Sequence, residues 1–98
     1  MVSATTILRI AMLRHELWED PAGHDTFCLA GPDGDGARDC LPPGSRLIWT
    51  ADAACHFDAM TLYYAYRKRG RYETQHPWDF EPYPDAWLER QNSSPKSR

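Results

Sequence analysis

The stretch Ala53–Arg69, AACHFDAMTLYYAYRKR, decides the fold, because its apolar residues repeat with the period of an α-helix. They form two stripes on nearly opposite faces of that helix. One stripe is Ala53, Phe57, Met60 and Tyr64, and the other is Cys55, Ala59, Leu62 and Tyr66. Thr50 or Asp52 is expected to cap the helix and Gly70 to close it. A helix in a small domain usually buries one stripe against a sheet, so a second stripe predicts a second covering element.

Three short segments before the helix are expected to form strands. Leu13–Trp18 partly alternates, Thr26–Ala30 follows the turn-forming run EDPAGHD, and Ser45–Thr50 is β-branched and aromatic at its centre. Ala37–Leu41 is expected to add one helical turn. The prediction is a small α+β domain, a three-stranded antiparallel sheet packed on one main helix. The expected core residues are Phe27, Leu47, Trp49, Phe57, Met60 and Tyr64.

The C-terminal segment HPWDFEPYPDAW, residues 76–87, contains three prolines and five aromatic side chains, counting His76. Prolines at this density favour extended backbone, and Pro84 is a natural start for a last short helix through Arg90. We expect the segment to wrap the domain and cover the second stripe of the helix. Exchange with a second protomer and docking on another protein are the alternatives, since Trp and Tyr are favoured at interfaces.

Size and charge restrict the class of protein. A chain of 98 residues makes one domain, and its net charge of −3 argues against a general nucleic-acid binder. Three cysteines without a CxxC pair favour a reducing cytoplasm over a disulfide framework, and no run is long enough to span a membrane. Residues 1–12 are expected to be a poorly ordered extension, residues 13–90 the domain, and residues 91–98 a solvated tail.

One polar edge of the helix is a candidate ligand site. His56, Tyr63 and Arg67 project along this edge, and Asp58 lies on the other edge. Such a set could bind a small molecule, with His56 transferring a proton, but solvated or capping side chains are the more common reading. The basic run Tyr66–Tyr72, YRKRGRY, suits single-stranded nucleic acid and equally suits a helix C-terminus.

The other motifs do not indicate a catalytic site or a metal site. Cys55 lies on an apolar stripe, which favours a buried structural thiol over a nucleophile. The run Asp33–Gly36, DGDG, lacks the acidic ligand that a calcium loop needs at its twelfth position, where Gly44 stands. No histidine or cysteine spacing typical of a metal site occurs. We therefore predict no catalytic residue, no metal and no cofactor.

Several segments together resemble a group of short bacterial proteins of unknown function. The shared pattern is ELWxD…FCLAG…HFxAMxxYY, and it extends over roughly Leu13–Trp87. The chain is also weakly similar to MbtH-like proteins, small partners of nonribosomal peptide synthetases, in its PxG turn near Pro43–Ser45, strand and amphipathic helix. Ser45 stands where that family has a tryptophan, and the WTDxRP ending is absent. The similarity therefore implies a three-stranded sheet on a helix and no activity.

These observations predict a cytoplasmic, non-catalytic interaction or regulatory module whose partner is another protein or a second copy of itself. A ligand-binding protein or enzyme using the His56 edge is the alternative, and nucleic-acid binding through residues 67–71 is a second one. The residues expected at the interaction surface are Cys55, Ala59, Leu62, Tyr66, Trp78, Tyr83 and Trp87.

Overall fold

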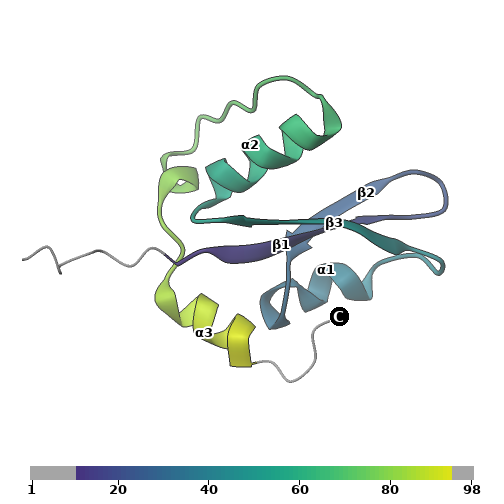
Figure 1. Cartoon of the computed structure of the whole chain (residues 1–98), viewed down its shortest axis with the longest axis horizontal. Helices are drawn as coiled ribbons and strands as arrows, with labels where there is room; N and C mark the ends of the chain where they lie inside the picture. The colour runs from purple at the N-terminus through teal and green to yellow at the C-terminus, as the bar shows by residue number, and fades with distance from the viewer. Residues whose placement is uncertain (1–10, 94–98) are drawn as a thin grey trace, which may run out of the picture.

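The computed structural model describes residues 11–93, and these form a three-stranded antiparallel sheet with helices on both faces (Figure 1). Of the extension expected at residues 1–12, residues 1–10 lie outside the described part, as do residues 94–98 of the expected tail. The elements are β1 (Leu13–Glu19), β2 (Asp25–Leu29), η2 (Pro32–Gly34), α1 (Asp35–Asp39), β3 (Arg46–Ala53), α2 (His56–Arg67), η3 (Pro77–Phe80) and α3 (Asp85–Ser93). The predicted α+β class is confirmed.

The sheet has the order β2-β1-β3, so β1 is central and both of its neighbours run antiparallel to it. Leu13, His15 and Leu17 alternate onto the face that α2 covers, and both leucines are fully buried. Glu16 and Trp18 lie on the opposite face, where Glu16 accepts from Trp18 Nε1 and from Arg38 of α1. Figure 1 shows α1 on the side of the sheet away from α2. A bulge between Leu17 and Trp18 shifts the register with β3.

The two stripes of α2 are covered in the reverse of the expected arrangement. The Tyr63 ring stacks on Phe27 of the sheet with centroids 4.8 Å apart, and Ala59 beside it is buried. Tyr66 stacks on Trp49 at 4.4 Å. The small residues of this stripe let the helix approach the sheet, so the prediction that the C-terminal segment covers it is wrong.

The C-terminal segment instead covers the first stripe. Phe57 stacks on Phe80 of η3 at 4.5 Å and contacts Tyr72 at 5.7 Å, and Tyr64 meets the Tyr72 ring edge-on at 5.2 Å. Large aromatic side chains on this face fill the space between the helix and the returning chain. Both stripes are therefore partly covered within the one chain.

The ends of α2 differ from the predicted ones. β3 continues through Asp52 to Ala53, because these residues still pair with β1, so neither Thr50 nor Asp52 is free to cap the helix. The N-cap is Cys55, whose Sγ accepts from the Asp58 amide at 3.5 Å. At the other end Lys68 adopts the left-handed conformation, with φ 56°, in place of a glycine.

The expected core is only partly right. Phe27, Trp49, Phe57, Met60 and Tyr64 are half-buried. Leu47 is 40% exposed, because it lies opposite Trp18 on the face that α2 does not cover. The buried apolar residues of the described chain are Ala11, Leu13, Leu17, Ala30, Ala53, Cys55, Ala59 and Tyr63.

A buried ion pair holds α1 against the sheet. The Arg38 guanidinium donates to Glu16 Oε1 at 3.1 Å, to the Leu29 carbonyl at 2.7 Å and to the Gly31 carbonyl. Gly34 permits this close packing, because a Cβ atom there would lie 1.8 Å from the Leu29 carbonyl oxygen. The run GPDGDGARD, residues 31–39, thus holds the side chain of its own Arg38 against the sheet.

The last helix ties the C-terminal segment to the start of β1. The Gln91 side-chain amide accepts from the Arg14 amide at 2.9 Å and donates to the carbonyls of Arg14 and Ala30 at 3.0 and 2.9 Å. Arg90 adds a two-point contact with Asp33. Because α3 extends to Ser93, the tail expected to be solvated from residue 91 starts within a bonded helix.

None of the helices between residues 11 and 93 is both long and apolar enough to cross a membrane.

Candidate functional site

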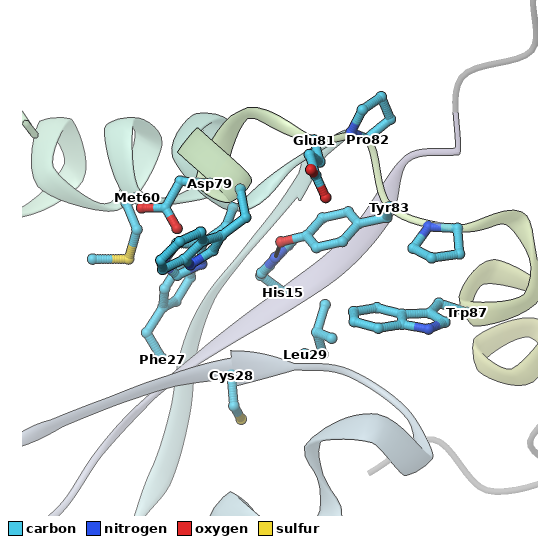
Figure 2. A pocket seen from close by; sticks show the side chains of 13 residues that line it. His15, Phe27, Cys28, Leu29, Met60, Asp79, Glu81, Pro82, Tyr83 and Trp87 are labelled. Carbon is cyan, nitrogen blue, oxygen red and sulfur yellow. Dashed lines mark hydrogen bonds between the residues drawn. The ribbon is translucent and has the colours of Figure 1, made fainter. Parts of the chain in front are cut away.

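A cavity of about 480 Å³ lies where the C-terminal segment crosses the sheet (Figure 2). Its walls come from β1, β2, the first half of α2, η3 and the start of α3. The lining residues are His15, Phe27, Cys28, Leu29, His56, Met60, Trp78, Asp79, Glu81, Pro82, Tyr83, Pro84 and Trp87. Six of these thirteen are aromatic, counting the two histidines, so nearly half of the lining residues present flat π-surfaces.

One wall of the cavity is a hydrogen-bonded pair, His15 and Tyr83 (Figure 2). His15 Nδ1 lies 3.0 Å from the Leu13 carbonyl, which only accepts, so Nδ1 donates. Nε2 is then the acceptor, and the Tyr83 hydroxyl donates to it at 2.9 Å. Burial lowers the pKa of His15 and raises the pKa of Tyr83. The pair is therefore uncharged at neutral pH.

Tyr83 is positioned by the backbone as well as by its hydroxyl. Its amide donates to the Ala54 carbonyl at 2.9 Å, which fixes the returning chain beside the end of β3. The Tyr83 ring stacks on Trp87 with centroids 5.7 Å apart, and His15 stacks on Phe27 at 5.4 Å. The short spacing of Pro82 and Pro84 keeps this segment extended.

Two carboxylates line the same cavity. Asp79 is buried, and its Oδ2 accepts from the Tyr72 hydroxyl at 3.1 Å. Hydrogen bonding from Thr74 and Tyr72 holds the pKa of Asp79 below its usual value, so it is ionised at neutral pH. Glu81 is exposed at the rim. No lysine or arginine is among the described lining residues, so Asp79 and Glu81 are the acidic groups of a lining that also contains His15 and His56.

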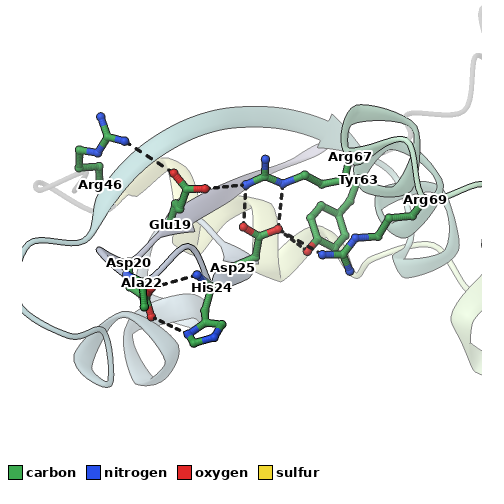
Figure 3. A network of polar contacts seen from close by, with 9 residues as sticks. All are labelled: Glu19, Asp20, Ala22, His24, Asp25, Arg46, Tyr63, Arg67 and Arg69. Carbon is green, nitrogen blue, oxygen red and sulfur yellow. Dashed lines mark hydrogen bonds and ion pairs between the residues drawn. The ribbon is translucent and has the colours of Figure 1, made fainter.

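Tyr63 and Arg67, two of the predicted ligand residues, are held in a separate ionic network (Figure 3). Tyr63 donates to Asp25 Oδ2 at 2.8 Å, and Arg67 contacts both oxygens of Asp25 at 2.6 and 2.9 Å. Burial opposes ionisation of Asp25, but the bonds from Arg67 and Tyr63 outweigh it and lower the pKa of Asp25. Arg69 lies 3.6 Å from the same carboxylate. This network clamps the β1–β2 hairpin to the end of α2.

The other two predicted ligand residues lie apart from the network and from each other. His56 lines the large cavity, whereas Asp58 lines a smaller one of about 310 Å³ beside Met12 and Leu62. The four side chains do not converge, because Tyr63 lies about two turns and Arg67 about three turns from the helix start, and both contact Asp25 of β2. Of the proposed edge, His56 alone reaches the cavity.

The predicted interaction residues also divide into groups. Cys55 and Ala59 are buried, while Leu62 and Tyr66 are each 40% exposed. The remaining three, Trp78, Tyr83 and Trp87, all line the cavity. Trp78 is 62% exposed, which makes it the most accessible of the large apolar side chains in the described part.

Sequence reasoning did not single out His15, Phe27, Asp79 or Glu81 as site residues. A histidine at an inward position between Leu13 and Leu17 was one available signal, because a buried histidine needs partners. Acidic residues interleaved with the aromatics of the run WDFEPY were the other. Neither signal indicates that β1 and the C-terminal segment meet.

Comparisons with protein-family models, curated proteins and solved structures find no match for this chain. The resemblances to the short bacterial proteins and to MbtH-like proteins stay predictions.

Proposed function

We propose that this protein is a non-catalytic binding module and that the aromatic cavity is its binding site for an organic cation. The observation that carries the proposal is the combination of aromatic walls with Asp79 and Glu81 and no lysine or arginine among the described lining residues. A cation gains from both features at once, because aromatic faces and carboxylates attract positive charge. An anionic ligand would meet only repulsion.

The dimensions suit a small ligand or a single side chain. A volume of about 480 Å³ falls within the range of about 300–1,000 Å³ typical of ligand pockets. Aromatic cages for ammonium groups derive about 0.5–2 kcal/mol from each well-placed ring. Tyr83 and Trp87 are stacked on each other, and the Arg90 guanidinium lies 6.0 Å from the centroid of the Trp87 ring, so this pair already attracts one cation of the protein itself.

A binding role is favoured over catalysis by the state of the polar groups. His15 and Tyr83 satisfy each other: Nδ1 of His15 donates to the Leu13 carbonyl and Nε2 accepts from the Tyr83 hydroxyl. Asp79 is ionised and hydrogen-bonded. These groups are therefore already hydrogen-bonded within the protein.

We also place the protein in the cytoplasm. Cys28, Cys40 and Cys55 are all unpaired, in keeping with a reducing compartment.

The test is isothermal titration with choline and with its uncharged isostere 3,3-dimethylbutan-1-ol. Choline is expected to bind at least fivefold more tightly, because only it has the charge that the cavity attracts. Trp87→Leu should weaken choline binding about tenfold, and Glu81→Gln about two- to fivefold.

Glu89→Gln is the matched control, since Glu89 is an exposed carboxylate of α3 that does not line the cavity. Equal binding of choline and the isostere, or equal losses in Glu81→Gln and Glu89→Gln, would refute the proposal.

A further inference from the structure

We propose that the outer edge of β2 accepts an extended peptide as a fourth strand, which places one basic side chain of that peptide in the aromatic cavity. This inference rests on the proposed function and names the class of partner that supplies the cation.

The free edge follows from the register of the hairpin. The Ala30 amide donates to the Arg14 carbonyl at 2.9 Å, one step along the register beyond the His15–Leu29 pair. Hydrogen-bonded and non-hydrogen-bonded pairs alternate along an antiparallel ladder. Phe27, opposite Leu17, is therefore in a non-hydrogen-bonded pair, as is Leu29. The backbone groups of both residues point away from β1.

Three of those outward groups have no hydrogen-bond partner within residues 11–93. The Leu29 carbonyl is occupied by Arg38 at 2.7 Å. The Phe27 amide, the Phe27 carbonyl and the Leu29 amide have no such contact in this part of the chain. A strand edge of this kind pairs readily with an added strand.

The direction of side chains links this edge to the cavity. A residue directly opposite Phe27 in an antiparallel added strand would project from the same face of the sheet as Phe27. That face holds His15 and the cavity, whereas the Cys28 side chain points away toward α1 (Figure 2). A lysine at this position would enter the cavity beside Asp79 and Glu81.

Charge complementarity favours a strand from another protein over a second copy of this chain at the β2 edge. The strand β2 has the sequence DTFCL, which contains no basic residue and one acidic residue. Pairing two β2 edges would therefore bring no cation into either cavity and would add negative charge. A segment of another protein with a lysine or arginine between small or β-branched residues fits both the edge and the cavity.

The probe is the peptide acetyl-Thr-Val-Lys-Val-Thr-amide, titrated into the full-length protein by calorimetry. Nα-acetyl-lysine methylamide presents the same side chain without a strand. The peptide is expected to bind at least tenfold more tightly than this compound. Replacing lysine with norleucine should cost at least tenfold, because the cavity then receives no charge.

Backbone N-methylation separates strand addition from simple cation capture. Methylating the lysine nitrogen removes the amide that would donate to the Phe27 carbonyl, and it should weaken binding at least tenfold. Methylating the preceding valine nitrogen, which would face solvent, is the matched control and should change affinity less than threefold. Amide resonances of Phe27 and Leu29 should shift on addition of the parent peptide.

Different results would refute strand addition and the cation site. Equal affinities for the peptide and for Nα-acetyl-lysine methylamide would refute strand addition and leave the cation site standing. Equal losses from the two N-methylated peptides would also refute strand addition. Light scattering that shows a dimer which the parent peptide does not dissociate would refute it as well. If choline does not bind and the peptide does not bind either, both proposals fail.

Discussion

Replacing Arg38 with methionine is expected to be one of the most destabilising single substitutions in this protein. The side chains of Arg38 and Glu16 are 2% and 3% exposed, so neither charge is stabilised by solvent. Methionine keeps an unbranched apolar stem like that of arginine but removes every donor. Glu16 would then be a buried carboxylate without a counterion.

The magnitude follows from the groups left unpaired. Besides Glu16, the carbonyls of Leu29 and Gly31 lose their guanidinium donors. Removing one partner of a buried ion pair costs about 3–5 kcal/mol. The total stability of a folded domain is about 5–15 kcal/mol, so this loss is a large fraction of it.

Urea unfolding followed by circular dichroism measures this loss. Arg46→Met is the matched control, because Arg46 is 74% exposed and lies 3.6 Å from Glu19, and it should change the unfolding free energy by about 0.5 kcal/mol or less.

Adding Glu16→Gln to Arg38→Met should recover about 1–2 kcal/mol, since glutamine is neutral and still accepts from Trp18 Nε1. A loss below about 1 kcal/mol in Arg38→Met, or a double variant less stable than the single one, would refute the reasoning.

Gly34→Ala should destabilise the protein by about 2–3 kcal/mol in the same unfolding assay, because its Cβ would meet the Leu29 carbonyl oxygen at 1.8 Å. Gly36→Ala, whose Cβ meets nothing within 4 Å, should be neutral or stabilising by up to about 1 kcal/mol. The lowered pKa of His15 means that the unfolded chain, with a pKa near 6.5, takes up the proton first as the pH falls. The contribution of His15 to stability is therefore complete above pH 6.5 and decreases below it, by at most about 1.4 kcal/mol per pH unit. A His15→Asn variant whose unfolding free energy keeps the same slope against pH between pH 6.5 and 5 would contradict this assignment.

The parts of the fold that could be predicted are those that local patterns determine. Alternation around Leu13 and Leu17 and the helical period of residues 53–69 give the strands and the main helix. The helix boundary was wrong because Asp52 is a plausible cap by type, and only its pairing with Arg14 across the sheet shows that it belongs to a strand. Local propensity does not contain that contact.

The assignment of the two stripes failed for a related reason. Residue size suggests that the larger stripe, with Phe57 and Tyr64, is the buried one. The structure packs Ala59 and Tyr63 on the sheet instead, because a small residue allows close approach while Tyr63 reaches Phe27. Which stripe meets which element depends on long-range packing.

The candidate site was predicted only in part. Trp78, Tyr83 and Trp87 were recognisable as binding residues from their aromatic character in a proline-rich segment. The opposite wall, formed by His15 and Phe27, is distant in sequence and is brought there by the sheet. A single sequence gives no signal for such a pairing.

The central claim is that the aromatic cavity binds organic cations, and the four tryptophan indole N–H resonances test it most directly. In a ¹H–¹⁵N titration with choline, the resonances of Trp78 and Trp87 should shift and saturate together, since both side chains line the cavity. Trp18 and Trp49 lie outside it and should stay in place. Four unchanged resonances, or equal shifts at all four, would contradict the account.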